Sequence, residues 1–143
     1  MPIYQTNIDD LTPHQFQGFF VGWPSHPEPS TLLRILENSY AVALAVDEDT
    51  GRVIGLANAL SDGVLSAYIP LLEVLPPWQG QGIGAHLIEL LREQLDHLYM
   101  IDLVCDAELE AFYRPLGFQP WTAMILRNYD NQRGAPQSRK TSG

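Results

Sequence analysis

The spacing of hydrophobic and polar positions along the chain changes between a helical and a strand period, and it predicts a series of elements. Apolar residues three and four apart are typical of an amphipathic helix, whereas strict alternation is typical of a strand. Strands are predicted over residues 2–7, 40–47, 52–60, 64–75, 99–106 and 121–129. Helices are predicted over residues 11–23, 30–39, 82–98 and 107–118. The order β-α-α-β-β-β-α-β-α-β indicates one α/β (α+β) domain with a mixed, mostly antiparallel central sheet flanked by helices.

Local signals mark several of the expected element ends. Thr12 is a suitable N-cap for the first helix, and Gln15 completes a T-x-x-Q capping box. Gly117 occupies a C-cap position after the last helix. Pro70 interrupts a strand, which predicts a bulge or a break in the ladder. The segment 130–143 is polar and aperiodic, so we expect a domain over residues 1–129 and a disordered tail over 130–143.

Charge and composition narrow the classes of partner. The chain has 17 acidic and 8 basic residues, a net charge of -9, which leaves no basic face for a nucleic acid. Acidity fits a cationic substrate, and it also fits a simple role in solubility. No apolar run approaches the roughly 18 residues of a membrane span, and the first residues lack a secretory-signal pattern. We therefore expect no membrane partner and a cytoplasmic location, with which the single Cys105 agrees.

The most informative stretch is "VLPPWQGQGIGAHL" at residues 74–87, where glycines occur at every second position between a predicted strand and a predicted helix. A helix N-terminus exposes unpaired N–H groups and the positive end of the macrodipole, and glycines let a phosphate reach them. Gly80, Gly82 and Ala85 also fit the dinucleotide fingerprint G-x-G-x-x-A. Against a dinucleotide fold, only one strand-helix-strand unit is present and no second half follows it. A purely structural glycine turn is a further alternative.

Two blocks of sequence resemble the GNAT superfamily of acyl-CoA-dependent N-acetyltransferases. "LEVLPPWQGQGIGAHL" is similar to the family's V-x-P-x-x-Q/R-G-x-G-x-G block, which ends the fourth strand and opens the third helix. "DAELEAFYRPLGF" is similar to the family's N-x-x-A-x-x-F-Y-x-x-x-G-F block. The resemblance extends over roughly residues 3–127 and implies a single GNAT-like domain with the element order predicted above.

The resemblance implies that acetyl-CoA is the cosubstrate and that backbone groups hold it. Amides around residues 81–85 would bind the pyrophosphate, while the pantetheine arm would lie between the splayed fourth and fifth strands, paired with the backbone near Val74. A bulge at Pro70 would re-aim this strand. The residues expected to bind acetyl-CoA are Val74, Gln79, Gly80, Gln81, Gly82, Gly84, Ala85 and Asp106.

Transfer of an acetyl group to an amine by direct attack requires a neutral amine, a stabilised oxyanion and a proton for the departing thiolate. The resemblance places Tyr113 as the general acid, with ordinary aromatic packing as the alternative. Glu73 lies in an apolar strand and is the candidate general base, the alternative being a buried hydrogen bond. In a regular strand Glu73 and Tyr68, the family's usual base position, face opposite ways unless a bulge at Pro70 reconciles them. Asp102 is a lesser candidate.

Other positions depart from the family pattern or carry no chemistry of their own. Asp106 stands where the family has Asn, and an ionised carboxylate accepts but does not donate a hydrogen bond. Leu109 stands where the family commonly has Ala. Cys105 has no neighbouring His and is interpreted as a small buried hydrophobe. The four histidines show no ligand spacing, so no metal is expected.

The acceptor is expected to be a small-molecule primary amine that approaches past the loop "GWPSHPEPS" at residues 22–30. Two alternatives stay open: a non-catalytic acyl-CoA binding module, and an enzyme that acetylates protein lysines or N-termini. The resemblance also makes a homodimer an expected form. Met124, Ile125 and Leu126 are usable at such an interface, although core packing is the alternative for at least two of them.

Overall fold

A computed structural model, which describes residues 1–136, has one five-stranded sheet with strand order β1-β2-β3-β4-β5. The strands are β1 (Pro2–Gln5), β2 (Ala41–Asp47), β3 (Val53–Ser61), β4 (Ser66–Val74) and β5 (Met100–Asp102). The first four strands are antiparallel neighbours and β5 pairs with β4 in parallel. The parallel pair is joined by the crossover through α2 (Ile83–Gln94). The predicted mixed, mostly antiparallel sheet is therefore confirmed.

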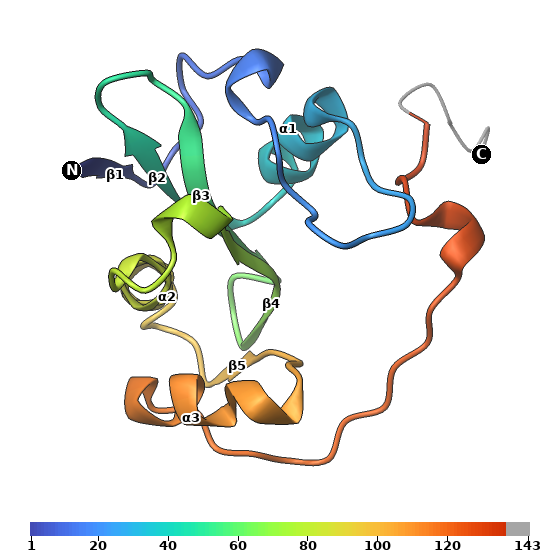
Figure 1. Cartoon of the computed structure of the whole chain (residues 1–143). Helices are drawn as coiled ribbons and strands as arrows, with labels where there is room; N and C mark the ends of the chain where they lie inside the picture. The colour runs from blue at the N-terminus through green and yellow to red at the C-terminus, as the bar shows by residue number, and fades with distance from the viewer. Residues whose placement is uncertain (137–143) are drawn as a thin grey trace.

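The two longer helices lie on opposite faces of the sheet (Figure 1). A Cβ at Gly55 on β3 would lie 3.2 Å from both Ile83 and Leu87, so this side of β3 faces α2. Asn58 lies three residues further along β3, so its side chain faces the other side of the sheet. There its Nδ2 donates to Oγ of Ser39, just beyond α1 (Pro29–Glu37). Leu87 is fully buried, because the apolar stripe of α2 packs directly on the sheet.

A bulge in β4 lies where the sequence predicted one. Asn58 pairs with Leu71 and Leu60 pairs with Tyr68, so β4 holds one residue more than β3 between these pairs. The extra residue falls in the stretch that contains Pro70, which has no N–H for the ladder. Glu73 pairs with Leu56 on β3. The bulge therefore brings Glu73 and Tyr68 to the same face of the sheet, although residues with an odd sequence separation face opposite ways in a regular strand.

The first predicted helix, over residues 11–23, was wrong in extent. Only a 3-10 turn forms, over Pro13–Gln15, and Gln15 accepts a hydrogen bond from Thr12 N–H at 2.9 Å as a capping box requires. The chain then leaves helical geometry, because Gly18 has φ +91° and Phe20 has φ +65°. Backbone conformation at these two residues overrides the apolar spacing that suggested a helix.

The C-terminal third differs from the prediction in three ways. The strand expected over residues 99–106 is limited to β5, and the strand expected over 121–129 does not form. The last helix is broken into the 3-10 turn Ala107–Leu109, the short α3 (Glu110–Tyr113) and the 3-10 turn Arg114–Leu116. A strand needs a neighbour to pair with its backbone N–H and C=O groups, and within residues 1–136 no hydrogen bond joins the backbone of residues 121–127 to another part of the chain.

The remaining short elements connect these parts. They are the 3-10 turns Pro76–Trp78, between β4 and α2, and Tyr129–Asn131, at the start of the expected tail. Residues 137–143 of that tail lie outside the described residues. Within residues 1–136, no helix combines the length and apolar character needed to cross a bilayer.

Candidate active site

The glycine turn before α2 leaves open space above a helix N-terminus. Gly80 and Gly82 have φ +78° and +83°, a region that favours glycine. Within residues 1–136, no group beyond the chain neighbours lies within 4 Å of the place where a Cβ would stand at either residue. Gly82 is the N-cap of α2 and has no side chain to cap it. The first N–H of α2 with a partner in the chain as described is that of His86, so the preceding amides point to open space.

Gly84 has a different role from the other two glycines. A Cβ there would lie 3.3 Å from Cζ of Phe112 and 3.8 Å from Cγ2 of Val74. The missing side chain thus lets the ring of Phe112, on α3, approach the first turn of α2. This contact packs the segment 106–118, which contains Phe112, against the glycine turn at residues 79–85.

The outer edge of β4 is free where acetyl-CoA was expected to bind. Pairing with β5 ends at Tyr68 and Asp102, whereas β4 continues to Val74. On the edge of β4 that faces β3, the backbone N–H of Leu75 donates to the Ile54 carbonyl at 2.8 Å. Successive residues of a strand direct their backbone groups to opposite edges, so the N–H and C=O of Val74 point away from β3. The predicted splay of these two strands is present, and it exposes a strand-like edge at Val74.

Gln79, expected to bind acetyl-CoA, has a contact within the protein. Its side-chain Nε2 donates to the Val74 carbonyl at 2.9 Å. This bond spans the connection Leu75–Trp78 and holds the glycine turn close to the end of β4. Gln81 is exposed and Ala85 is half-buried in the first helical turn.

Tyr113 lies in a cavity of about 890 Å³ between β5, α3 and the segment that follows α3, hereafter the Tyr113 cavity. Its ring packs edge-on against Phe112 and Phe118, with centroids 4.8 and 5.7 Å away. Desolvation by burial, with a smaller effect of Cys105, raises the pKa of Tyr113 to about 12. The phenol therefore keeps its proton through the neutral range, as a general acid must.

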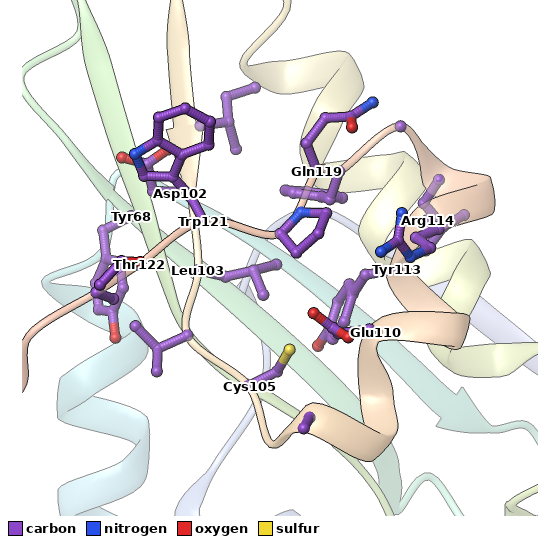
Figure 2. A pocket seen from close by; sticks show the side chains of 18 of the residues that line it. Tyr68, Asp102, Leu103, Cys105, Glu110, Tyr113, Arg114, Gln119, Trp121 and Thr122 are labelled. Carbon is purple, nitrogen blue, oxygen red and sulfur yellow. The ribbon is translucent and has the colours of Figure 1, made fainter.

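Cys105, Glu110 and Asp102 are among the titratable side chains that line the Tyr113 cavity. Figure 2 shows the Cys105 thiol and the Glu110 carboxylate directed toward the Tyr113 ring. Burial, and then the negative charges of Glu110 and Asp106, raise the pKa of Cys105, so the thiol stays protonated. Asp102 lines the same cavity and is the cross-strand partner of Tyr68. The cavity thus contains Asp102, the lesser candidate for the base, and Tyr68, which the resemblance places at the usual base position.

Glu73 lies in a second cavity, of about 420 Å³, on the α1 side of the sheet, hereafter the Glu73 pocket. Its wall is formed by apolar and aromatic side chains and by Gln79. The lining residues are Phe19, Phe20, Val21, Trp23, Leu32, Leu56, Pro70, Leu71, Leu72, Glu73 and Gln79. Glu73 is the one acidic or basic residue of this lining. The structure therefore places the two predicted catalytic residues in different cavities.

Both carboxylate oxygens of Glu73 accept backbone hydrogen bonds. Oε1 accepts from Phe20 N–H at 2.8 Å and Oε2 from Val21 N–H at 3.1 Å. Phe20 is 6% exposed and adopts a positive φ that costs a bulky residue on the order of 1–3 kcal/mol. Glu73 consequently ties the loop that forms one wall of the pocket to β4. Its role as a general base stays a prediction.

Asp106, the last predicted binding residue, sits at the turn into the 3-10 segment Ala107–Leu109. Its side chain is exposed and its carbonyl accepts from Leu109 N–H at 2.9 Å. It lines neither cavity. Over residues 1–136 no group of three or more His, Cys, Asp or Glu side chains is arranged to hold a metal ion.

Sequence reasoning missed several wall residues of the two cavities. Phe19 and Phe20 belonged to a predicted helix, so their place in the Glu73 pocket was not foreseen. Trp121 and Thr122, which line the Tyr113 cavity, belonged to a predicted strand. The positive φ of Phe20 has no signal in the local sequence, whereas Gly18 and Gly22 do indicate a break in the helix.

Comparison with known proteins gives one consistent family. The model of the family described as "Acetyltransferase (GNAT) family" matches residues 8–118. A histone acetyltransferase, TAP1, from Glycine max is 40% identical over 110 residues, which cover 69% of this chain and 47% of that protein. A chloroplastic serotonin N-acetyltransferase 2 from Oryza sativa subsp. japonica is 35% identical over 102 residues, covering 68% of this chain and 50% of that protein.

A crystal structure of a candidate acetyltransferase from Deinococcus radiodurans R1 superposes with a TM-score of 0.92 at 48% identity. It covers 94% of this chain and 94% of its own. The chain spans about half the length of the curated relatives that it matches.

Proposed function

The chain belongs to the GNAT family of acetyltransferases, and we propose that it transfers the acetyl group of acetyl-CoA to the primary amine of a small molecule. The observation that carries this proposal is the uncapped N-terminus of α2 beside the free edge of β4. The N-terminus of α2 suits the pyrophosphate of acetyl-CoA, and the free edge of β4 suits its extended pantetheine arm, which contains amides.

The residues around the glycine turn fit acetyl-CoA without any basic side chain. The free amides at the start of α2 and the open space at Gly80 and Gly82 would hold the pyrophosphate. The outward N–H of Val74 would pair with the pantetheine arm or stabilise the developing oxyanion. When bound, acetyl-CoA supplies the acetyl group as a thioester.

Tyr113 would donate the proton to the departing thiolate. Its buried phenol has a raised pKa, so it is protonated at neutral pH and available as a donor. Its hydroxyl faces the Tyr113 cavity beside Cys105 (Figure 2). Aromatic packing on Phe112 and Phe118 fixes the ring, so the hydroxyl position does not depend on a hydrogen bond.

The amine acceptor would occupy the Glu73 pocket, with an apolar or aromatic body. Phe19, Phe20 and Trp23 supply aromatic surface there. Glu73 supplies the negative charge, and a carboxylate that accepts two N–H groups still has lone pairs for an ammonium group. The excess of acidic residues over the whole chain favours the approach of a cation.

The direct test is the release of free CoA thiol from acetyl-CoA in the presence of single amines. The panel contains a simple arylalkylamine, an aliphatic polyamine and a lysine-containing peptide. We expect fastest turnover with the arylalkylamine, and we expect Trp23→Ala to raise its KM with acetyl-CoA affinity unchanged. Turnover with the peptide alone would move the assignment to protein acetylation, and acetyl-CoA binding without turnover of any amine would indicate a binding module.

A further inference from the structure

Residues 129–135, hereafter the C-terminal strap, lie against α1. The strap begins with the 3-10 turn Tyr129–Asn131 and turns again at Gly134, which adopts φ +88°. A Cβ at Gly134 would lie 3.1 Å from Cγ2 of Thr31, so the strap backbone approaches α1 closely. Within residues 1–136, no hydrogen bond joins the backbone of residues 119–127 to another part of the chain. The strap is therefore held by its own contacts and not by the segment that leads to it.

Two arginines fasten the strap, one from each side of the contact. Arg34, on α1, donates from Nη2 to the Ala135 carbonyl. Arg133, on the strap, donates from Nε to Ser25 Oγ at 3.0 Å. Hydrogen bonds from a guanidinium are stronger than those between neutral groups. Figure 1 shows the strap, in red, returning beside α1. The strap is thus attached both to α1 and to the loop that precedes it.

That loop, residues 20–28 and hereafter the acceptor loop, is fixed at its first end by Glu73. Glu73 accepts hydrogen bonds from the N–H groups of Phe20 and Val21 at 2.8 and 3.1 Å. Further along, within residues 1–136, the bond from Arg133 to Ser25 is the one hydrogen bond that reaches residues 23–27 from another segment. The second half of the loop therefore depends on the strap.

Ser25 lies between two aromatic residues that pack on the same ring. Trp23 packs against Phe20 with ring centroids 4.7 Å apart, and Trp23 N–H donates to the Phe20 carbonyl at 3.1 Å. His26 lies nearly parallel to the Phe20 ring, with centroids 6.4 Å apart. Phe20 and Trp23 both line the Glu73 pocket. Holding Ser25 in place therefore restricts the aromatic wall of that pocket.

The strap acts on the pocket from outside it. Arg133 and Ser25 are both absent from the lining of the Glu73 pocket, so neither would touch an amine bound there. An effect of Arg133 on the acceptor would therefore pass through the position of Trp23 and Phe20.

We propose that the C-terminal strap positions the acceptor side of the site, with Arg133 as the positioning residue that holds the aromatic wall through Ser25. This inference rests on the proposed function, because it takes the Glu73 pocket as the place of the amine. An ordered wall reduces the freedom that an arylalkylamine would otherwise have to restrict on binding. The functional domain then extends to residue 135, beyond the boundary at residue 129 that the sequence suggested.

Steady-state kinetics with an arylalkylamine test the proposal. We expect Arg133→Ala to raise the KM for the amine about fivefold, which corresponds to about 1 kcal/mol, the net contribution of one hydrogen bond. The kcat and the affinity for acetyl-CoA should not change, because the strap does not reach the glycine turn or Val74. Arg133→Lys keeps a charged donor and should recover most of the lost affinity for the amine.

Arg127→Ala is the matched control for charge. It removes the same charge from the same part of the chain, and its Nη1 donates only weakly, at 3.5 Å, to the neighbouring Leu126 carbonyl. We expect the wild-type KM for this variant. If Arg133 acted on a cationic amine through charge alone, both alanine variants would lower the KM, and that result would overturn the proposal.

A double-mutant cycle identifies the contact through which Arg133 acts. Ser25→Ala should raise the KM as Arg133→Ala does, and the double variant should show no larger effect than either single one, since both remove the same bond. Additive effects, or an unchanged KM in folded Arg133→Ala, would overturn the proposal. Circular dichroism establishes that each variant is folded.

Hydrogen exchange, resolved by residue with NMR, tests the same contact without any acetyl transfer. The Trp23 amide, which donates to the Phe20 carbonyl, should exchange at least about fivefold faster in Arg133→Ala than in the wild type or in Arg127→Ala. Equal exchange in all three proteins would contradict the positioning role. A chain that turns over no amine but shows the faster exchange would refute the proposed function and leave the contact between strap and loop established.

Discussion

The carboxylate of Glu73 on β4 holds the backbone N–H of Phe20 at 2.8 Å, and Phe20 adopts φ +65° there. The two residues are far apart in sequence and belong to different walls of the Glu73 pocket. The bulge in the stretch that contains Pro70 places Glu73 on the same face of the sheet as Tyr68. The pocket therefore depends on a register shift in one strand and on a strained residue in a loop.

Glu73→Gln tests whether this carboxylate mainly holds the loop. One amide oxygen replaces two acceptors, and the amide nitrogen would face the N–H of Val21 or Phe20. We expect the free energy of unfolding to fall by about 1–3 kcal/mol and the KM for the amine to rise. Urea unfolding and steady-state kinetics measure the two effects.

Glu89→Gln is the matched control for this substitution. Glu89 is exposed on α2, so its replacement should change stability by less than about 0.5 kcal/mol. A fall in kcat of more than about a hundredfold for Glu73→Gln, with stability unchanged, would instead assign the general base to Glu73.

Tyr113→Phe removes the proposed acid and keeps the aromatic ring. Because the ring is held by Phe112 and Phe118, the fold should be retained. We expect kcat to fall by about a hundredfold or more while the affinity for acetyl-CoA is preserved. Tyr129→Phe, at a 69% exposed tyrosine, should keep full activity. Equal kcat values for Tyr113→Phe and the wild type would leave Tyr113 as a packing residue only.

The raised pKa of Tyr113 predicts a loss of stability in alkali. The folded-state pKa of about 12 exceeds the ordinary value near 10, so between these values the unfolded chain loses the proton first. This stabilisation is complete below about pH 10 and is lost as the pH rises toward about 12. Urea unfolding at about pH 9 and about pH 11 should show a larger loss for the wild type than for Tyr113→Phe. Identical losses would show that Tyr113 ionises alike in both states.

The sequence allowed the glycine turn and the irregularity at Pro70 to be predicted because each has a local cause. Gly80 and Gly82 mark positive φ before a helix, and Pro70 removes a ladder donor. The helix over residues 11–23 failed because Phe20 is held at positive φ by a distant carboxylate, Glu73. Such a contact has no local pattern.

The last strand failed for a different physical reason. Residues 121–129 have the apolar composition of a strand, but a strand requires a hydrogen-bonded neighbour. The predicted strand was wrong, because within residues 1–136 no hydrogen bond joins the backbone of residues 121–127 to a neighbouring segment.

The separation of Tyr113 and Glu73 was likewise beyond sequence reasoning. The motifs identified both residues, but motif spacing carries no information about which cavity each side chain enters. The structure adds Asp102 beside Tyr68 in the Tyr113 cavity and aromatic residues from the loop in the Glu73 pocket. The catalytic base and the cytoplasmic location stay predictions.

The most direct test of the account is calorimetric titration of acetyl-CoA into the wild type, Gln81→Glu and Gln81→Lys. Gln81 is exposed beside the free amides of α2 and is not at positive φ, so neither substitution strains the turn. Glu should repel the pyrophosphate and weaken binding tenfold or more, about 1.4 kcal/mol, although an acidic residue at a helix N-terminus stabilises the helix itself. Lys should bind acetyl-CoA at least as tightly as the wild type. Equal affinities for all three proteins, or no binding by the folded wild type, would contradict the assignment of this helix terminus as the acetyl-CoA site.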